Sequence, residues 1–393
     1  MKNETVKFIG VDDREIDLFE SQYLVPEGMC YNSYLVLGEK IAVMDSVDAR
    51  KTGEWMEKLS AALDGRKPDY IVVQHMEPDH SGSIAAFLNE YPETVVVCSA
   101  QASKIMGQFN EGLSPKFLLV KEGDRLDLGK GVVLEFIAAP MVHWPEVMMT
   151  YLPCEKTLFS ADGFGKFGVY DADPDDWACE ARRYYFNICG KYGAQVAAVL
   201  KKAAGLEIET ICPLHGPVLE GEGLAEALRL YTIWSAYDVE TPGGVLVAYA
   251  SIHGNTAAAA ARIAEILKEK GAAKVALADL SRDDMAETIE DAFRMGSMVL
   301  ACATYDADIF PPMRSFLQKL ANKGFQRRRV GLIENGSWAP QAAKFMRGLL
   351  EGMKDVEIVE PTVTLRSSLN TSQVSELEAL ADAILKSLNV GTA

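Results

Sequence analysis

The sequence has very little histidine and no paired cysteines. Only five of its 393 residues are histidine, and its seven cysteines are scattered without a single Cys-x-x-Cys pair. Cysteine pairs at that spacing hold most structural zinc ions and iron–sulfur clusters, so their absence argues against both kinds of site. An odd number of scattered cysteines is also typical of reduced thiols in a cytoplasm, and not of a disulfide framework.

Long apolar runs and an excess of positive charge are also missing. The first residues, MKNETVKFIG, lack the apolar core of a secretion signal, and no stretch approaches the roughly 18 apolar residues of a membrane span. The formal net charge of −17 makes nucleic acid and anionic membranes poor partners. We therefore expect a cytoplasmic protein that binds neither nucleic acid nor membrane.

The chain changes character near the Thr-Pro-Gly-Gly sequence at residues 241–244. Before this point, short β-rich runs such as 31–37 are interspersed with helical patterns such as 176–203, which predicts two packed sheets flanked by helices. After it, five apolar strands alternate with helices, a rhythm typical of a doubly wound parallel sheet. We expect an α/β protein with two domains, 1–240 and 244–393.

Four of the five histidines precede this boundary, and each lies at a predicted strand end or in a turn. The motif His-x-Glu-x-Asp-His at residues 75–80 places four potential metal ligands directly after the apolar run at 70–73. Taken singly, these side chains are ordinary loop residues, and Asp79 is suited to capping the following helix. Together they predict a metal site. Its candidate ligands are His75, Glu77, Asp79, His80, His143, Asp162 and His215.

Seven protein ligands are too many for one tetrahedral zinc ion. They suit two metal ions about 3.5–4 Å apart, with Asp162 or a hydroxide between them and open positions for a substrate. Mixed nitrogen and oxygen ligation with open positions favours non-haem iron. Zinc and manganese remain compatible with these ligand types.

A second site is predicted after residue 244. The motif Ser-Ile-His-Gly-Asn-Thr joins a predicted strand to a helix, where backbone N–H groups bind phosphate without lysine or arginine. It resembles the phosphate loop of flavodoxins. Loops after two later strands fall where an isoalloxazine ring would lie, with Tyr305 and Trp338 as aromatic neighbours or as packing residues. The predicted FMN contacts are Ser251, Ile252, His253, Gly254, Asn255, Thr256, Ala303, Thr304, Tyr305, Asp306, Ala307, Asn335, Gly336, Ser337 and Trp338.

The two motifs in this order resemble the flavodiiron protein family. Glu77 stands where metallo-β-lactamase hydrolases carry a second histidine, and this change favours iron over zinc. The resemblance implies a metallo-β-lactamase-like αββα sandwich followed by a flavodoxin-like five-stranded parallel sheet, with FMN and two iron ions as cofactors. It further implies that His75, Glu77 and His143 hold one iron, that Asp79, His80 and His215 hold the other, and that Asp162 bridges them.

The same resemblance implies an oxidoreductase that reduces O₂ to water, NO to N₂O, or both, with no catalytic residue beyond the metal ligands. Electrons would pass through FMN from a rubredoxin or a similar donor, and the chain would form a head-to-tail homodimer or a dimer of dimers. Because no Cys-x-x-Cys pair is present, we expect the short form, without a rubredoxin module.

Two other functions compete with this one. The first is a zinc-dependent hydrolase fused to a flavodoxin-like electron carrier, against which Glu77 argues. The second is an electron carrier with a vestigial metal site, against which the complete set of ligand types argues.

Overall fold

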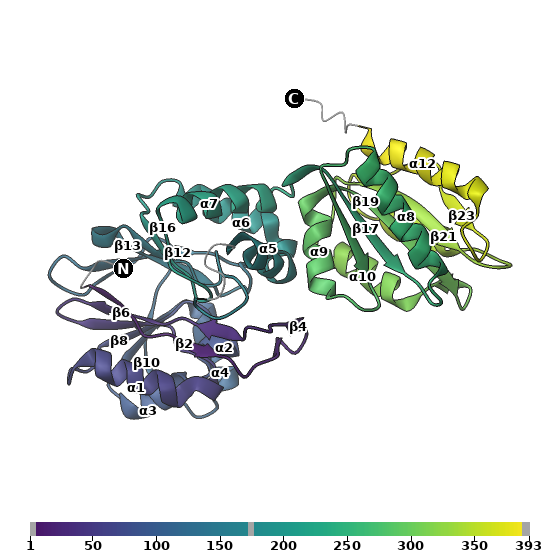
Figure 1. Ribbon diagram of the computed structural model, residues 1–393. Coiled ribbons are helices and arrows are strands. Elements are labelled where there is room, and N and C mark those ends of the chain that lie inside the picture. The colour runs from purple at the N-terminus through teal and green to yellow at the C-terminus, as the bar shows by residue number, and fades with distance from the viewer. Residues whose placement is uncertain (1–4, 172–176, 387–393) are drawn as a thin grey trace. The chain divides into compact units, whose positions relative to one another are not determined.

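The chain folds into two compact units, Met1–Thr232 and Ile233–Ala393. The structure is a computed structural model that describes residues 5–171 and 177–386 (Figure 1). The division between the units falls inside helix α7 (Gly221–Ser235), after Thr232, whereas the sequence predicts that the first domain ends at residue 240.

The first unit contains two six-stranded sheets that pack face to face. In sheet order, one consists of β1 (Val6–Phe8), β6 (Tyr34–Leu37), β7 (Ile41–Met44), β8 (Tyr70–Val73), β9 (Val95–Cys98) and β10 (Lys116–Leu119). The other consists of β11 (Arg125–Asp127), β12 (Val133–Ala138), β13 (Met148–Leu152), β14 (Thr157–Phe159), β15 (Thr210–Cys212) and β16 (Leu219–Glu220). Val36 and Val72 of the first sheet share one buried core with Phe136 and Phe159 of the second.

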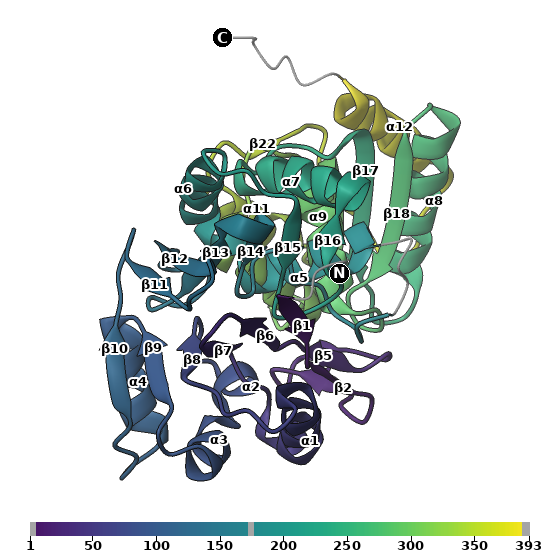
Figure 2. The ribbon, with the colours of Figure 1, turned by 90° about the vertical axis from the view of Figure 1, so that its left-hand side faces the viewer.

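Helices cover the outer faces of both sheets (Figures 1 and 2). Helices α1 (Thr52–Leu63), α3 (Ile84–Glu90) and α4 (Ala100–Phe109) lie beside the first sheet, and α5 (Trp177–Ile188), α6 (Gly193–Ala203) and α7 lie beside the second. Helix α1 buries Trp55, Leu59 and Leu63, whose four-residue spacing forms a single apolar stripe. The αββα fold class expected from the sequence is confirmed.

Two of the expected elements of this unit are wrong in detail. The strand expected over 31–37 is two strands, because β5 (Met29–Tyr31) pairs with β2 (Val11–Asp13) while β6 starts only at Tyr34. Between them, the Asn32 amide donates to the carbonyl oxygens of Pro213 and Gly216, at 2.9 and 2.8 Å, and so turns the chain out of the first strand.

The helix expected over 176–203 is also two helices. Helix α5 ends at Ile188, a 3₁₀ turn spans Gly190–Tyr192, and α6 starts at Gly193. Glycines at both ends of the turn weaken helix continuation through their high backbone entropy. The expected first residue, Asp176, lies outside the described residues.

The second unit is a doubly wound parallel sheet, as expected. Its order is β18 (Lys274–Asp279), β17 (Thr241–Ala250), β19 (Met295–Tyr305), β21 (Arg329–Asn335) and β22 (Glu357–Ile358), and these neighbours pair in parallel. The outer strand resumes as β23 (Val363–Leu365) after Pro361, which has no N–H to donate to a ladder. A short strand β20 (Asp308–Ile309) turns back antiparallel onto β19.

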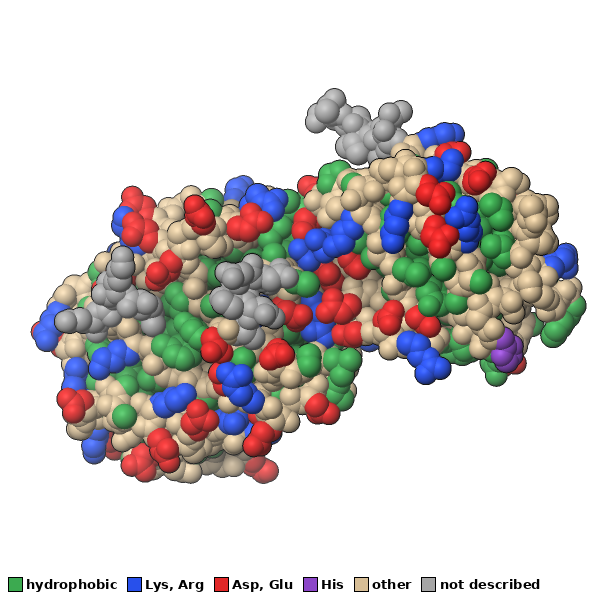
Figure 3. All heavy atoms as spheres, viewed as in Figure 1, with side chains coloured by type: hydrophobic (Ala, Val, Ile, Leu, Met, Phe, Trp, Pro, Cys, Tyr) green, Lys and Arg blue, Asp and Glu red, His purple; other side chains and the backbone are tan. Residues whose placement is uncertain are grey.

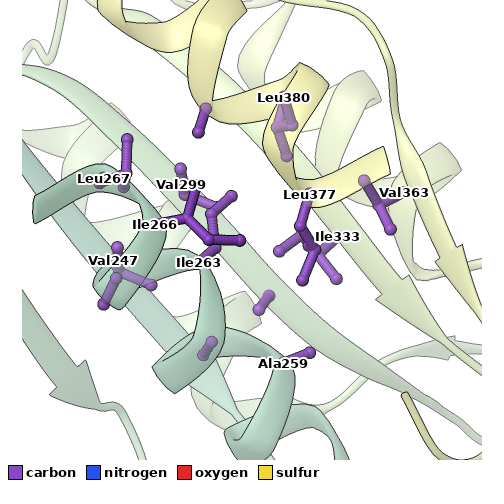
Figure 4. Packing of buried hydrophobic residues seen from close by; sticks show 14 of the residues in the cluster. Val247, Ala259, Ile263, Ile266, Leu267, Val299, Ile333, Val363, Leu377 and Leu380 are labelled. Atoms are coloured by element: carbon purple, nitrogen blue, oxygen red, sulfur yellow. The ribbon is translucent and has the colours of Figure 1, made fainter. Parts of the chain in front are cut away.

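Helices α8 (Asn255–Glu269) and α12 (Thr371–Leu385) close one face of this sheet. The unit also contains α9 (Met285–Arg294), α10 (Pro311–Asn322) and α11 (Ala342–Leu350). Figure 4 shows Ile263 of α8 and Leu377 of α12 packed around Val299 and Ile333 of the central strands. Burying each such side chain stabilises the fold by about 1.5–3 kcal/mol. This core leaves the carboxyl ends of β17, β19 and β21 at one edge, where their loops meet.

Charged side chains of both signs lie interspersed on the face drawn in Figure 3. Among the described residues, none of the helices combines the length and the apolar character needed to cross a bilayer.

Candidate metal centre and flavin pocket

The predicted metal ligands lie at strand ends of both sheets of the first unit. Strand β8 ends at Val73, and the short helix α2 (Pro78–Ser81) follows. Glu77 is the N-cap residue of α2 and Pro78 is its first residue, a position where the missing N–H of proline costs nothing. Asp79 and His80 therefore occupy the first helical turn, close to His75 in the preceding loop.

The remaining ligands come from the second sheet. His143 lies in the loop between β12 and β13, Asp162 follows β14, and His215 follows β15. Although 140 positions separate the first predicted ligand from the last, the fold brings all seven side chains together in two adjacent groups, which we call the metal cluster.

The first group of the metal cluster consists of His75, Glu77, His143 and one oxygen of Asp162. The Nε2 atoms of His75 and His143 lie 3.2 and 2.9 Å from Glu77 Oε2. Both nitrogens also lie 3.2 Å from Asp162 Oδ2. Two imidazole nitrogens and two carboxylate oxygens thus face a common centre.

The second group uses the other oxygen of Asp162. His80 Nε2 lies 3.1 Å from both Asp162 Oδ1 and Asp79 Oδ2. His215 Nε2 lies 3.2 Å from Asp79 Oδ2 and 3.0 Å from His80 Nε2. Asp162 therefore offers one oxygen to each group, which is the arrangement that a carboxylate bridge between two cations requires.

Two observations test whether metal ions fit this cluster. Ligand atoms about 2.0–2.1 Å from a tetrahedral cation lie roughly 3.3 Å from one another, close to the separations seen here. In addition, both carboxylate oxygens of Asp79 and of Asp162 are buried without a hydrogen bond from any described residue. Buried carboxylates without such donors are costly unless a cation neutralises them, so the cluster fits two metal ions.

Hydrogen bonds orient two of the histidines. His75 Nδ1 donates to Glu146 Oε1 over 2.8 Å, and His215 Nδ1 donates to the carbonyl oxygen of Cys30 over 2.7 Å. Both bonds place the proton on Nδ1 and leave the Nε2 lone pair directed at the metal cluster. Glu146 is buried and also accepts from the Met76 N–H at 3.0 Å.

The charges of the cluster favour a bound cation. Burial acts to lower the pKa of His80, but the carboxylates of Asp79 and Asp162 raise it by more than burial lowers it. The resulting pKa of His80 is about 10. Burial likewise lowers the pKa of His143, and Asp162 and Glu77 raise it to about 9. Burial raises the pKa of Asp162, yet the surrounding histidines hold it well below its usual value. The carboxylates of the metal cluster therefore stay ionised and favour a positive charge on the neighbouring histidines. Protons and metal ions can both supply that charge, and they compete for the same histidine nitrogens.

Asp45 holds the loop that carries His75, and sequence reasoning missed it. It follows β7, is fully buried, and accepts from the Gln74 N–H at 2.7 Å and from Gln74 Nε2 at 2.9 Å. Burial raises the pKa of Asp45 to about 6. Its isolated position in the sequence carries no metal-ligand spacing that would have signalled this role.

A pocket of about 300 Å³, the entrance pocket, leads to the metal cluster. Glu77 and Asp79 line it, one from each ligand group. Strand β3 (Leu18–Phe19), which forms a hairpin with β4 (Tyr23–Leu24), also lines it, as do Glu20 and Ser21 of the hairpin loop. The Phe19 ring packs edge-on against His215 with centroids 5.5 Å apart. A small substrate can therefore approach both groups from one side.

A second pocket, of about 660 Å³, lies at the carboxyl edge of the parallel sheet in the second unit, and we call it the carboxyl-edge pocket. The loops after β17, β19 and β21 line it, including every predicted FMN contact except Gly254. Gly254 is instead the N-cap residue of α8, where its φ of +86° favours glycine. Ala339, Gln341 and Ser367 also line the pocket, and sequence reasoning missed them.

The start of α8 fits a phosphate group. Its N-cap residue, Gly254, has no side chain that could cap the first turn, so the N–H groups of this turn have no intrahelical acceptor and no capping side chain among the described residues. An anion at this position would accept from them and would also be stabilised by the helix dipole. Ser251 Oγ accepts from the Gly254 N–H at 3.1 Å, which shapes the loop around this position.

Aromatic side chains mark the other part of the carboxyl-edge pocket. Trp338 is 88% exposed and Tyr305 is 44% exposed, so neither belongs to the core. Asn335 ties the loops together, because its Nδ2 donates to the Ser367 carbonyl at 2.8 Å and its Oδ1 accepts from the Ser367 N–H at 3.1 Å. An anion site at the start of α8 and exposed aromatic rings on other loops of the same pocket fit a phosphorylated flavin.

Comparisons with known proteins agree with these two sites. Residues 29–216 match the ODP family beta lactamase model, and residues 247–369 match the Flavodoxin model. The anaerobic nitric oxide reductase flavorubredoxin of Aliivibrio fischeri is 29% identical over 343 residues, which cover 85% of this chain and 68% of that protein.

Two solved structures share the whole fold. Rubredoxin oxygen:oxidoreductase from Desulfovibrio gigas has a TM-score of 0.91 at 25% identity, covering 98% of this chain and 97% of that one. The flavodiiron protein from Giardia intestinalis also has a TM-score of 0.91, at 24% identity, covering 97% of this chain and 95% of that one.

The fold and the two sites define a class of protein in which a β-lactamase-like metal domain is joined to a flavodoxin domain. Within that class, the chain belongs to the flavodiiron protein family.

Proposed function

We propose that the protein is an oxidoreductase that reduces O₂ to water, NO to N₂O, or both, at a pair of non-haem iron ions. The proposal rests on the position of the Asp162 carboxylate between the two ligand groups. Its Oδ2 faces His75 and His143, and its Oδ1 faces His80. The relatives named for nitric oxide reduction and for rubredoxin:oxygen oxidoreduction support the reaction class.

His75, Glu77 and His143 would hold one iron, Asp79, His80 and His215 the other, and Asp162 would bridge them. Glu77 supplies an anionic oxygen ligand, which favours iron over zinc. Glu146 and the Cys30 carbonyl keep the imidazoles of His75 and His215 in the tautomer that binds metal. When bound, the iron pair supplies a place for the gas molecule and two electrons.

FMN would occupy the carboxyl-edge pocket, with its phosphate at the start of α8 and its ring near Tyr305 and Trp338. When bound, it supplies two electrons, so that flavin and iron together hold the four that O₂ + 4H⁺ + 4e⁻ → 2H₂O requires. The alternative, 2NO + 2H⁺ + 2e⁻ → N₂O + H₂O, requires two. We propose a rubredoxin or a similar small redox protein as the electron donor.

The proposal extends to assembly and location. Exposed apolar side chains line both pockets: Leu18 lines the entrance pocket, and Ile252, Tyr305 and Trp338 line the carboxyl-edge pocket. Such rims favour contact with another chain, and thus a head-to-tail homodimer or a dimer of dimers. The seven free cysteines support a cytoplasmic location.

The test is gas consumption by the reduced protein. Stopped-flow oxidation by O₂ and by NO, with a reductase supplying electrons, should show many turnovers with at least one gas. His143→Ala should abolish turnover while FMN stays bound, because His143 and the carboxyl-edge pocket belong to different units. A wild-type protein that is inert to both gases would refute the proposed function.

A further inference from the structure

The carboxyl-edge pocket contains a charge imbalance. Among its described lining residues, Asp306 is the only one with a carboxylate, and neither lysine nor arginine is present. The other lining residues are neutral, apart from the titratable imidazole of His253. A flavin bound there would therefore face one fixed negative charge with no cation on the pocket wall to offset it.

Asp306 is held in place by a tight turn. Tyr305 pairs with Asp308 across the β19–β20 hairpin, so Asp306 and Ala307 are its two loop residues. Their φ angles of +50° and +57° define a type I′ turn, the two-residue loop that fits the twist of a hairpin. Aspartate tolerates this left-handed conformation, whereas for alanine it is energetically unfavourable. The turn therefore lowers the stability of the fold somewhat.

The carboxylate of the neighbouring Asp308 is paired with a positively charged side chain, whereas no described residue forms an ion pair with Asp306. Asp308 forms an ion pair with Arg314 and accepts from the Ile309 N–H at 2.7 Å. Asp306 forms no ion pair with any described residue, although it lies two positions away in the same hairpin. The two carboxylates thus form a natural comparison within one loop.

Asp306 lies beside Tyr305 in the loop after β19. Tyr305 and Trp338 line the same pocket and mark where the flavin ring would lie, while the phosphate position at the start of α8 belongs to a different loop. Two-electron reduction adds two electrons and one proton to the ring near neutral pH and leaves one extra negative charge on it. A nearby carboxylate repels that charge and so destabilises the reduced form.

Building on the proposed function, we infer that Asp306 is a redox-tuning residue, which lowers the reduction potential of the bound flavin by placing an uncompensated carboxylate beside its ring. A lower potential makes the reduced flavin a stronger donor to the iron pair. The electrons and the proton come from the donor protein and from water, so Asp306 itself neither binds nor releases anything in the reaction.

The test compares Asp306→Asn with Asp308→Asn in the full-length protein loaded with FMN and iron. Both substitutions remove one negative charge from the same hairpin, and asparagine tolerates the left-handed turn at least as well as aspartate. The two-electron midpoint potential of the flavin is measured by anaerobic titration against a redox dye, followed in the flavin absorbance.

Asp306→Asn should raise the reduced-to-oxidised ratio at a fixed potential by about three- to tenfold. Tenfold corresponds to about 30 mV for a two-electron couple. Asp308→Asn should give a clearly smaller shift, and added salt should shrink the difference between Asp306→Asn and wild type because exposed charges are screened.

Unchanged potentials in Asp306→Asn, or equal shifts in the two variants, would overturn this inference and leave the proposed function intact. A wild-type protein that binds no FMN would overturn both. Loss of FMN from Asp306→Asn alone would assign the residue to binding and also contradict a tuning role.

Discussion

At the scale of single residues, we infer that a few side chains of the metal cluster determine which ions bind there. Glu77 offers a carboxylate where metallo-β-lactamase hydrolases carry a histidine. Asp162 presents one carboxylate oxygen to each of the two ligand groups. Glu146 and the Cys30 carbonyl act one step further out, through the Nδ1 atoms of His75 and His215. Single substitutions among these residues should alter which metal binds and how tightly, while leaving the fold largely intact.

Glu77→His should shift the metal preference from iron towards zinc. The substitution adds a softer nitrogen ligand and removes one negative charge, which makes the first group resemble a zinc hydrolase site. Metal analysis after growth with both metals should show a several-fold lower iron-to-zinc ratio than wild type. Glu54→His, on the surface of α1, is the matched control and should leave the ratio unchanged. An unaltered ratio in Glu77→His would contradict the role given to this carboxylate.

Glu146→Gln should weaken metal binding by about 10- to 100-fold, the usual cost of losing a carboxylate behind a ligating histidine. The amide oxygen still accepts from His75 Nδ1, but it no longer strengthens the basicity of the ring. Competition with a chelator measures the affinity. Glu93→Gln, which alters an exposed acid paired with Lys116, should bind metal like wild type. Equal affinities in both variants would show that Glu146 has no part in the site.

At the scale of elements, strand ends and tight turns bring the ligands together. Gly216 shows how little freedom these turns have, since its φ is +79° and an added Cβ would lie 2.7 Å from Lys166 Cγ. Lys166 is buried, so its side chain has little room to move away. The turn after β15 thus depends on glycine directly beside His215, a proposed metal ligand.

Gly216→Ala should destabilise the first unit by about 1–2 kcal/mol from the left-handed backbone alone, with the contact to Lys166 adding to this. Thermal unfolding followed by circular dichroism measures the loss. Gly107→Ala, inside α4 with open space around its Cβ position, should be neutral or stabilising by about 0.5–1 kcal/mol. A Gly216→Ala protein as stable as wild type would disprove the constraint.

Many of the strands and the positions of the motifs beside them can be predicted from the sequence, because apolar runs and motifs are local signals. The strand lies at 70–73 as the pattern indicates, the candidate ligands after it lie together with those from later in the chain, and residues of the 251–256 motif line the carboxyl-edge pocket. Asp45 and Ser367 were not predictable, since each joins its site through a hydrogen bond set by tertiary structure. The break at Asn32 was missed for the same reason, because it depends on hydrogen bonds to Pro213 and Gly216. The break between α5 and α6 does have a local signal, in Gly190 and Gly193.

At the scale of the whole molecule, the metal cluster and the carboxyl-edge pocket belong to separate compact units with separate cores. Each cofactor should therefore be removable without the other. Stripping the metal with a chelator should abolish gas consumption while leaving the flavin absorbance and stoichiometry within error of the untreated protein. Restoring iron should restore turnover. Simultaneous loss of FMN and metal would show that the two units do not bind their cofactors independently.

We expect that two iron ions bind the protein, one on either side of the Asp162 carboxylate. Diffraction from crystals of the iron-loaded protein, recorded at the iron absorption edge, tests it directly. We expect two anomalous peaks per chain, one adjoining His75, Glu77 and His143 and the other adjoining Asp79, His80 and His215. A single peak, or a signal that appears only at the zinc edge, would contradict the account.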